Sequence, residues 1–204
     1  MNEMGQTISE KILSRKVGEA VSPGEIVKVN YDLAASHDIS TADAVQHFES
    51  WDGSEIAEPD RLAIVPDHLV PSHNDYAQRV YNISKEFAQE HGIEIFYPLS
   101  ETGQMHAVLP EDGHVKPGDV VIGADSHTLT YGALGAFATG VARSDLAFAW
   151  IHGWTWLRVP ETLRVEFKGT PAEWVMGKDL ALYILSELGL DGAVYRAVEV
   201  GGPT

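Results

Sequence analysis

Apolar positions along the chain follow two spacings, one typical of helices and one typical of strands. Helical spacing predicts helices over residues 8–16, 41–50, 76–92, 141–152 and 177–189. Short apolar runs bounded by Pro or Gly predict strands over residues 26–33, 62–65, 93–98, 120–122 and 162–169. Because helices alternate with strands, the pattern favours an α/β fold with a largely parallel sheet covered by helices on both faces.

Polar side chains that suit acid–base chemistry follow two of these strands or lie in the loop between them. They are Asp67, His68, His106, Asp125, Ser126 and His127. Ligands of open parallel sheets bind outside the carboxyl ends of the strands, so these side chains are expected to meet at one edge. On an extended backbone Asp125 and His127 would point to the same side, with Ser126 pointing away.

A carboxylate beside an imidazole fixes the tautomer of the ring and raises its basicity, as general acid–base catalysis requires. The glycines that follow, Gly132, Gly135 and Gly140, would let backbone N–H groups approach an anion at a loop-to-helix transition. A structural alternative is that Asp125 or Ser126 caps a helix while the small residues pack tightly beneath the sheet. The residue pattern alone leaves both interpretations open.

Other histidines and tryptophans have simpler interpretations. The histidines expected to be structural are His47, His73, His91, His114 and His152. The tryptophans Trp150, Trp154 and Trp156 lie close together, and core packing or a subunit interface explains them better than a platform for stacking bases.

Composition narrows the classes of partner. The 204 residues carry 30 acidic and 14 basic side chains, and a net charge of −16 opposes binding to a phosphate backbone, so no nucleic-acid partner is expected. The N-terminus is polar and no apolar stretch has the length of a membrane helix, which predicts a cytoplasmic protein without a membrane partner. The chain has no cysteine, so it cannot supply thiolate ligands or a cysteine nucleophile.

The stretch "GADSHTLTYGALGAFATGVARSDLA" resembles the signature of the aconitase family of hydro-lyases. The likeness extends through "TISEKIL", "VPDHLVPS", "KPGDVVIGADSHT" and "TWLRVPETLRVEFKG", and so covers nearly the whole chain. It implies that residues 1–204 form one three-layer α/β/α domain, the aconitase-type first domain. The likeness is strongest to the branch of the family that acts on isopropylmalate, of whose large subunit this chain would be about the first half.

The resemblance also implies roles for individual residues. The positions that match the family's catalytic motifs are Asp67, His68, His106, Asp125, Ser126 and His127. In this assignment each Asp pairs with a neighbouring imidazole, and His106 helps to orient the hydroxyl group of the substrate. His37 and Asp38 match a region that contacts substrate in the family. No residue of the chain is assigned as a metal ligand.

The family implies a [4Fe–4S] cluster with an open iron site, at which a hydroxy acid loses and regains water. Its cysteine ligands are not in this chain. The expected function is therefore that of the N-terminal part, or a split subunit, of a hydro-lyase that interconverts 2- and 3-isopropylmalate or related malates. Expected partners are the cysteine-bearing remainder of the large subunit, a small swivelling subunit and a small hydroxy-acid substrate. Without the cysteine-bearing partner the chain is expected to be inactive.

Two alternatives remain. In a cluster-independent lyase, a lone Zn²⁺ or Fe²⁺ ion would be bound by His68, His106 and His127 with Asp67 or Asp125. In a non-catalytic assembly module, the fold would persist while the tryptophans and the acidic surface bind a partner.

Overall fold

A five-stranded parallel sheet forms the centre of the computed structural model, which describes residues 5–51 and 55–202. Its strands, in spatial order, are β4 (Ile95–Phe96), β3 (Leu62–Ile64), β2 (Leu33–Ser36), β5 (Val120–Gly123) and β6 (Phe137–Gly140). All four neighbouring pairs are parallel. The three central strands are buried throughout, as expected for a parallel sheet with both faces covered. The predicted parallel sheet is thus confirmed.

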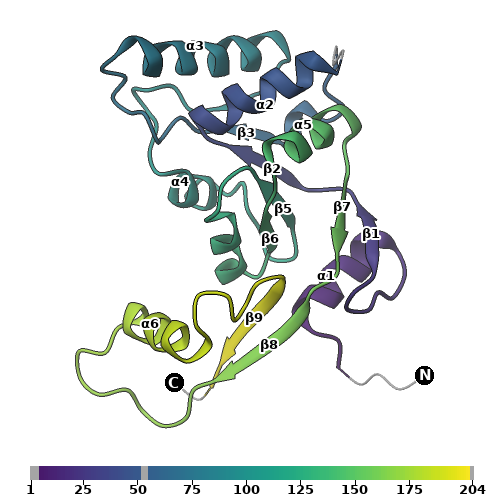
Figure 1. The fold of residues 1–204 in the computed structure, drawn as a ribbon, viewed down its shortest axis with the longest axis vertical. Coiled ribbons are helices and arrows are strands. Elements are labelled where there is room, and N and C mark those ends of the chain that lie inside the picture. The colour runs from purple at the N-terminus through teal and green to yellow at the C-terminus, as the bar shows by residue number, and fades with distance from the viewer. Residues whose placement is uncertain (1–4, 52–54, 203–204) are drawn as a thin grey trace.

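Helices pack on both faces of this sheet (Figure 1). On one face lie α2 (Asp38–Ser50), α3 (Asp75–Glu90) and α5 (Arg143–His152), whose apolar side chains surround Ile64 and Ile122. On the other face lie α4 (Met105–Glu111) and the 3-10 helix η2 (Thr128–Leu134), which pack against Leu33 and Val121. Alternate strand residues therefore enter separate cores, and the predicted three-layer α/β/α arrangement is confirmed.

The strand predicted over residues 26–33 is in fact two strands. β1 (Ile26–Val29) pairs antiparallel with β7 (Thr155–Arg158), whereas β2 belongs to the central sheet. The break falls at Tyr31 and Asp32, which fasten the chain to other elements. The buried Tyr31 hydroxyl donates to the Ala149 carbonyl at 3.0 Å, and the Asp32 carboxylate accepts from the Val120 amide at 2.7 Å. These contacts redirect the chain from one sheet to the next.

The sequence predicts the start of the first helix correctly but misses part of the structure after β5. α1 (Ile8–Val17) begins at the predicted capping box, in which Thr7 and Glu10 bond to each other's backbone amides.

His106 lies in α4, not in the predicted loop. The helix predicted after Gly140 is present as α5, but the stretch between Asp125 and Gly140, predicted as a loop, forms η2 and then β6. A further short 3-10 helix, η1 (Pro59–Arg61), precedes β3.

The C-terminal segment forms a separate unit, here called the C-terminal unit, of β8 (Glu161–Glu166), α6 (Gly177–Leu188) and β9 (Arg196–Gly201). Its two strands are parallel and pair only with each other within the described residues. The unit lies below the central sheet, next to α1 (Figure 1). The Ile8 amide of α1 donates to the Glu199 carboxylate of β9 at 2.7 Å. No residue from 160 to 202 is buried, so this unit has no core of its own.

The two parts of the chain should differ sharply in their contribution to stability. Ile122→Ala removes a fully buried side chain from β5 and is expected to lower the free energy of unfolding by about 2–5 kcal/mol. Leu190→Ala, at a position that is 88% exposed, should change it by less than about 0.5 kcal/mol. Urea unfolding followed by circular dichroism measures both, and equal losses would contradict the assignment of the core.

Candidate active site

The carboxyl ends of β2, β3 and β5 meet at one edge of the sheet, and each is followed within a few residues by Asp and His side chains. The segments concerned contain His37 and Asp38, Asp67 and His68, and Asp125, Ser126 and His127. The connection after β4 leads into α4, which carries His106 at its second position. The structure thus brings all of the sequence-predicted site residues to the edge where α/β proteins bind ligands.

Asp38 ties the loop after β3 to the start of α2. Its carboxylate accepts from the Leu69 amide at 2.7 Å and from the Ile39 amide at 2.9 Å, and it lies 3.3 Å from Nδ1 of His37. Burial disfavours the charged form of Asp38, but the bonds from His37 and the two amides outweigh it and hold the pKa of this carboxyl below its usual range. Asp38 is 2% exposed, which makes it a buried anchor of the site.

His68 is held by a carboxylate and by a second imidazole. Its Nδ1 lies 2.5 Å from Asp67, and its ring stacks on that of His37 with centroids 3.7 Å apart. The other carboxylate oxygen of Asp67 accepts from the Met105 amide at 2.7 Å, in the first turn of α4. The His68 side chain is 43% exposed, so a ring of fixed orientation remains accessible to a small molecule.

The closest imidazole to Asp125 is that of His106, not that of His127. Nε2 of His106 lies 2.6 Å from the carboxylate, whereas Nδ1 of His127 lies 3.6 Å away on a side chain that is 79% exposed. The expected extended backbone is wrong here, because residues 125–127 form a turn in which the Asp125 carboxylate accepts from the His127 amide at 2.8 Å. Ser126 is exposed, with its hydroxyl 3.2 Å from Nδ1 of His127.

The two carboxylate–imidazole pairs are close neighbours. Nε2 of His68 lies 4.0 Å from the Asp125 carboxylate, so the pair Asp67–His68 adjoins the pair Asp125–His106. Burial of Asp125 raises the pKa of its carboxyl group. Hydrogen bonds from His106 and the His127 amide, together with the charges of the nearby imidazoles, lower this pKa by a larger amount, so the net shift is downward. Asp125 therefore remains a carboxylate at neutral pH and accepts the hydrogen bond from Nε2 of His106.

Tyr131 was not singled out in the sequence, yet its ring packs next to that of His106. Its buried ring lies 5.2 Å from the His106 ring, and burial, together with the Asp125 and Asp67 carboxylates, raises the pKa of its phenol. Its hydroxyl donates to the Met105 carbonyl at 3.4 Å. The only signal for Tyr131 in the sequence is its place within the family-like stretch that follows His127.

A cavity of about 520 Å³ opens beside the Asp67–His68 pair. Its lining residues are Asp67, His68, Val70, Thr102, Gly103 and Gln104. Potential metal-ligating atoms of His37, Asp38, Asp67 and His68 lie within 4.8 Å of one another. This set differs from the one considered for a lone metal ion, which combined His68 with His106 and His127.

Gly140 permits the close approach of β6 to the Asp125 turn. A Cβ atom at Gly140 would lie 2.8 Å from the Asp125 carbonyl oxygen, which is a backbone atom with little freedom to move. Gly135 ends η2 with a φ of 79°, a conformation that favours glycine. Gly140 therefore supports the turn by tight packing, whereas a Cβ atom at Gly132 would meet nothing within 4 Å and η2 has no side-chain cap from Asp125 or Ser126.

Of the histidines predicted to be structural, His91 and His152 pack against aromatic rings, whereas His73 is exposed in the loop that follows His68. His91, for example, ends α3 and packs its ring against Phe48 and Phe87, with centroids 5.2 and 4.5 Å apart. Trp150 is part of the main core, whereas Trp154 stacks under the Lys28 ammonium group and Trp156 is 55% exposed. The tryptophans therefore do not form a common stacking platform.

Comparison with known proteins decides the family. The family model described as the aconitase family (aconitate hydratase) matches residues 10–204. The chain belongs to the aconitase family. The 3-isopropylmalate dehydratase large subunit of Thermoanaerobacter pseudethanolicus is 45% identical over 199 residues, which are 98% of this chain and 48% of that protein. Those of Aliarcobacter butzleri and Aquifex aeolicus are each 47% identical, over 98% of this chain and 47% and 46% of their own lengths.

The chain therefore spans about half the length of these relatives. Among its described residues, no helix is both long and apolar enough to cross a lipid bilayer. The paired carboxylates and imidazoles at the edge of the sheet form the candidate site of this aconitase-family chain.

The lowered pKa of Asp125 predicts a specific pH dependence of stability. Because the folded pKa lies below the unfolded value of about 3.9, the stabilisation is complete above that pH and is lost as the pH falls through the folded pKa. Asp125→Asn should therefore reduce the slope of unfolding free energy against pH below about pH 4. Urea titrations at several pH values measure this slope, with Ser126→Ala as the neighbouring control. An unchanged slope in Asp125→Asn would contradict the assignment.

Gly140→Ala should displace the Asp125 turn, because the new methyl group meets the Asp125 carbonyl. The expected loss of unfolding free energy is about 1–3 kcal/mol. Gly132→Ala is the matched control, since a Cβ atom there meets nothing within 4 Å and the backbone φ is not positive. Thermal unfolding of the two variants compares them, and an equal melting temperature would argue against tight packing at Gly140.

Proposed function

We propose that this chain provides the N-terminal half of a 3-isopropylmalate dehydratase large subunit, a hydro-lyase that interconverts 2- and 3-isopropylmalate. The observation that carries the proposal is the pair of adjacent carboxylate–imidazole couples, Asp67–His68 and Asp125–His106, at the ligand-binding edge of the sheet. Similarity to proteins of that name over nearly the whole chain supports this choice of substrate.

The reaction needs proton transfer at two neighbouring carbon atoms. In dehydration, a base takes a proton from one carbon, a double bond forms, and the hydroxyl group on the next carbon leaves as water after it receives a proton. Addition of water with the opposite placement of H and OH gives the isomer. An imidazole held by a carboxylate can give and take such a proton near neutral pH. We assign this role to His68, whose ring Asp67 holds, and to Asp125 and His106 acting together through the Asp125 carboxylate, because Nδ1 of His106 is buried.

The remaining predicted residues have supporting roles in the proposal. His37 and Asp38 shape the substrate side of the site, because the His37 ring stacks on His68 and Asp38 anchors the following loop. His127 and Ser126 are exposed at the mouth of the site, where they are free to contact substrate.

The family implies a [4Fe–4S] cluster, and the donor set of this chain does not bind one. The site offers imidazole nitrogens and carboxylate oxygens, and the sequence contains no cysteine. The cluster ligands therefore come from residues outside this chain, in the half that the relatives possess. When bound there, the cluster would polarise the hydroxyl and carboxylate groups of the substrate. Nδ1 of His106 is buried without a hydrogen-bond partner among the described residues, so the ring is held through Nε2 by Asp125.

A lone divalent metal ion is the second candidate for the site. The proximity of His37, Asp38, Asp67 and His68 favours it. The hydrogen bonds at the site argue against a metal ion. The Asp38 carboxylate already accepts hydrogen bonds from two backbone amides, and the Asp67 carboxylate accepts one, which leaves few free lone pairs for an ion. A purified chain with stoichiometric Zn²⁺ or Fe²⁺ that is lost in His68→Ala would support this alternative.

Complementation tests the proposed function. The chain, mixed with the C-terminal half of the Aquifex aeolicus large subunit, a small subunit, iron and sulfide, is expected to convert 3-isopropylmalate, whereas each polypeptide alone is expected to be inactive. His106→Ala in the mixture should lower kcat by about 10²–10⁴, the usual effect of removing an acid–base group. His114→Ala, at a position after the end of α4, should retain activity. Absence of conversion in a mixture that contains an intact cluster would refute the proposal.

A further inference from the structure

The 3-10 helix η2 follows the Asp125 turn directly and carries two fully buried side chains, Thr128 and Tyr131. A 3-10 helix has about three residues per turn, so two residues three positions apart lie on the same face. Leu129 and Leu134, by contrast, are 65% and 43% exposed. One face of η2 is therefore buried, and this face carries a hydroxyl group and a phenol.

Thr128 holds the backbone of Asp125. Its hydroxyl donates to the Asp125 carbonyl at 2.8 Å, and its amide donates to the same oxygen at 3.3 Å. The packing around this hydroxyl is tight, because a Cβ atom at Gly123, the last residue of β5, would lie 2.5 Å from it. Thr128 thereby fixes the residue whose carboxylate accepts from His106.

Tyr131 holds the first turn of α4. Its ring lies 5.2 Å from the His106 ring, and its hydroxyl donates at 3.4 Å to the Met105 carbonyl, which belongs to the peptide bond that joins Met105 to His106. The Met105 amide in turn donates to the Asp67 carboxylate at 2.7 Å. Because an O–H···O bond of 3.4 Å is long, the ring contact supplies most of the support that Tyr131 gives.

His106 depends on such support because its own bonds are few. Nε2 lies 2.6 Å from the Asp125 carboxylate, whereas Nδ1 is buried without a partner among the described residues. The helix that carries it has seven residues and includes Pro110, which has no N–H to donate to the His106 carbonyl four residues earlier. The position of the ring is therefore set largely by neighbours outside α4.

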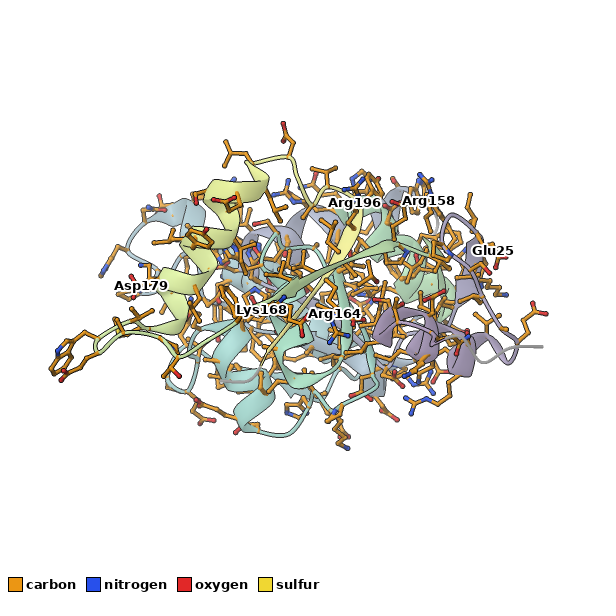
Figure 2. The ribbon with its side chains drawn as sticks, turned by 90° about the horizontal axis from the view of Figure 1, so that it is seen from below. Glu25, Arg158, Arg164, Lys168, Asp179 and Arg196 are labelled. Atoms are coloured by element: carbon orange, nitrogen blue, oxygen red, sulfur yellow. The ribbon has the colours of Figure 1, made fainter. Side chains whose placement is uncertain are left out.

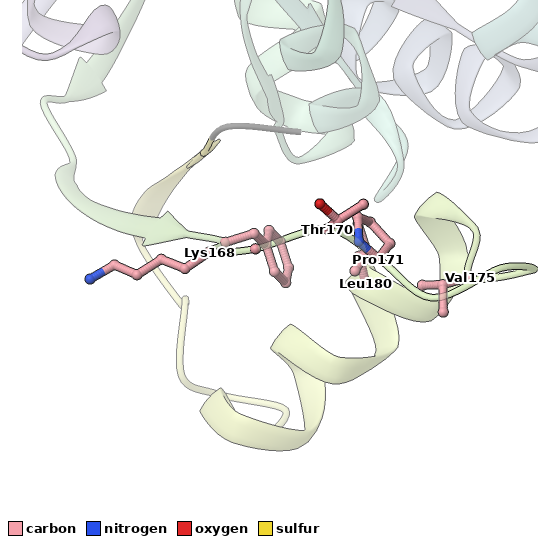
Figure 3. Close-up of a pocket in the computed structure, with 7 residues that line it drawn as sticks. Lys168, Thr170, Pro171, Val175 and Leu180 are labelled. Atoms are coloured by element: carbon pink, nitrogen blue, oxygen red, sulfur yellow. The ribbon is translucent and has the colours of Figure 1, made fainter.

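The cationic groups and the second cavity of the molecule lie elsewhere. The ion-pair partners of Asp125 among the described residues are all histidines. Arg158, Arg164 and Arg196 project from β7, β8 and β9, which are not strands of the central sheet (Figure 2). The cavity of about 150 Å³ beside α6 shares no lining residue with the cavity next to Asp67 (Figure 3). Packing around η2 is thus left to orient the pair.

We propose that Thr128 and Tyr131 are positioning residues, which hold the Asp125 carboxylate and the His106 ring in register from one face of η2. Thr128 acts through the Asp125 carbonyl, and Tyr131 acts through the His106 ring and the Met105 carbonyl. The three-residue spacing of the 3-10 helix sets the separation of the two contacts. This inference rests on the proposed function, which gives the Asp125–His106 pair its acid–base role.

The Nε2 proton of His106, followed by ¹⁵N NMR in the isolated chain, tests the proposal without any partner. Its short bond to Asp125 should make it exchange slowly with water. Thr128→Val removes the hydroxyl at similar volume, and Tyr131→Leu removes the ring. Each change is expected to speed the exchange of this proton by at least about tenfold, while amides of β3 exchange as before. Slow exchange in both variants would overturn the proposal.

Conservative variants separate positioning from a general loss of packing. Thr128→Ser keeps the hydroxyl and Tyr131→Phe keeps the ring, so both should retain the slow exchange of the His106 proton. Leu129→Ala, at an exposed position on the same helix, is the matched control and should also retain it. If Tyr131→Leu does not fold, the two Thr128 variants decide the outcome. Equally fast exchange in Thr128→Ser and Thr128→Val would count against the proposed contact.

Activity of the complemented enzyme distinguishes this inference from the proposed function. Thr128→Val and Tyr131→Leu should lower kcat for 3-isopropylmalate by at least about tenfold, because small displacements of reacting groups are costly, and the conservative variants should restore it. Faster proton exchange in the variants, with no conversion in any mixture, would support the positioning role and refute the function. Conversion with an unchanged kcat in both variants would refute the positioning role and leave the function intact.

Discussion

The Asp125 carboxylate is the interaction on which the site depends. It follows the central strand β5, accepts hydrogen bonds from His106 and from the His127 amide, and lies 4.0 Å from the His68 ring. A buried carboxylate is costly unless donors surround it, and here the donors come from α4 and from its own turn. The same bonds that compensate its burial therefore orient the histidines. Asp67 and Asp38 repeat this arrangement at the ends of β3 and β2, through the amides of Met105 and Leu69.

The sequence was sufficient to predict much of this arrangement. Apolar runs ending in polar residues predicted the parallel strands, and the rule that ligands bind at strand carboxyl ends placed the Asp and His residues together. Local pattern could not predict which imidazole pairs with Asp125, because the partner, His106, is 19 residues away and is brought near by α4. The turn at residues 125–127 was likewise missed, since it depends on the Asp125 side chain accepting a backbone amide.

The strand boundary near Tyr31 shows the same limit. The β-branched residues before Tyr31 and the apolar residues after it predict one continuous strand. The contacts of Tyr31 with Ala149 and of Asp32 with Val120, both distant in the sequence, divide this stretch between two sheets. β9 was not predicted either, because its alternating apolar residues have no core to face among the described residues. The C-terminal unit has no buried residue among those described, and the chain as a whole carries nitrogen and oxygen donors but no thiolate.

The central proposal is that Asp125 and His106 act as one acid–base unit. A double-mutant cycle on kcat, with Asp125→Asn, His106→Gln and both changes in the complemented enzyme, tests it most directly. If the two residues act together, the double variant loses about as much activity as the more damaging single variant. Losses that simply multiply, as for independent residues, would contradict the claim.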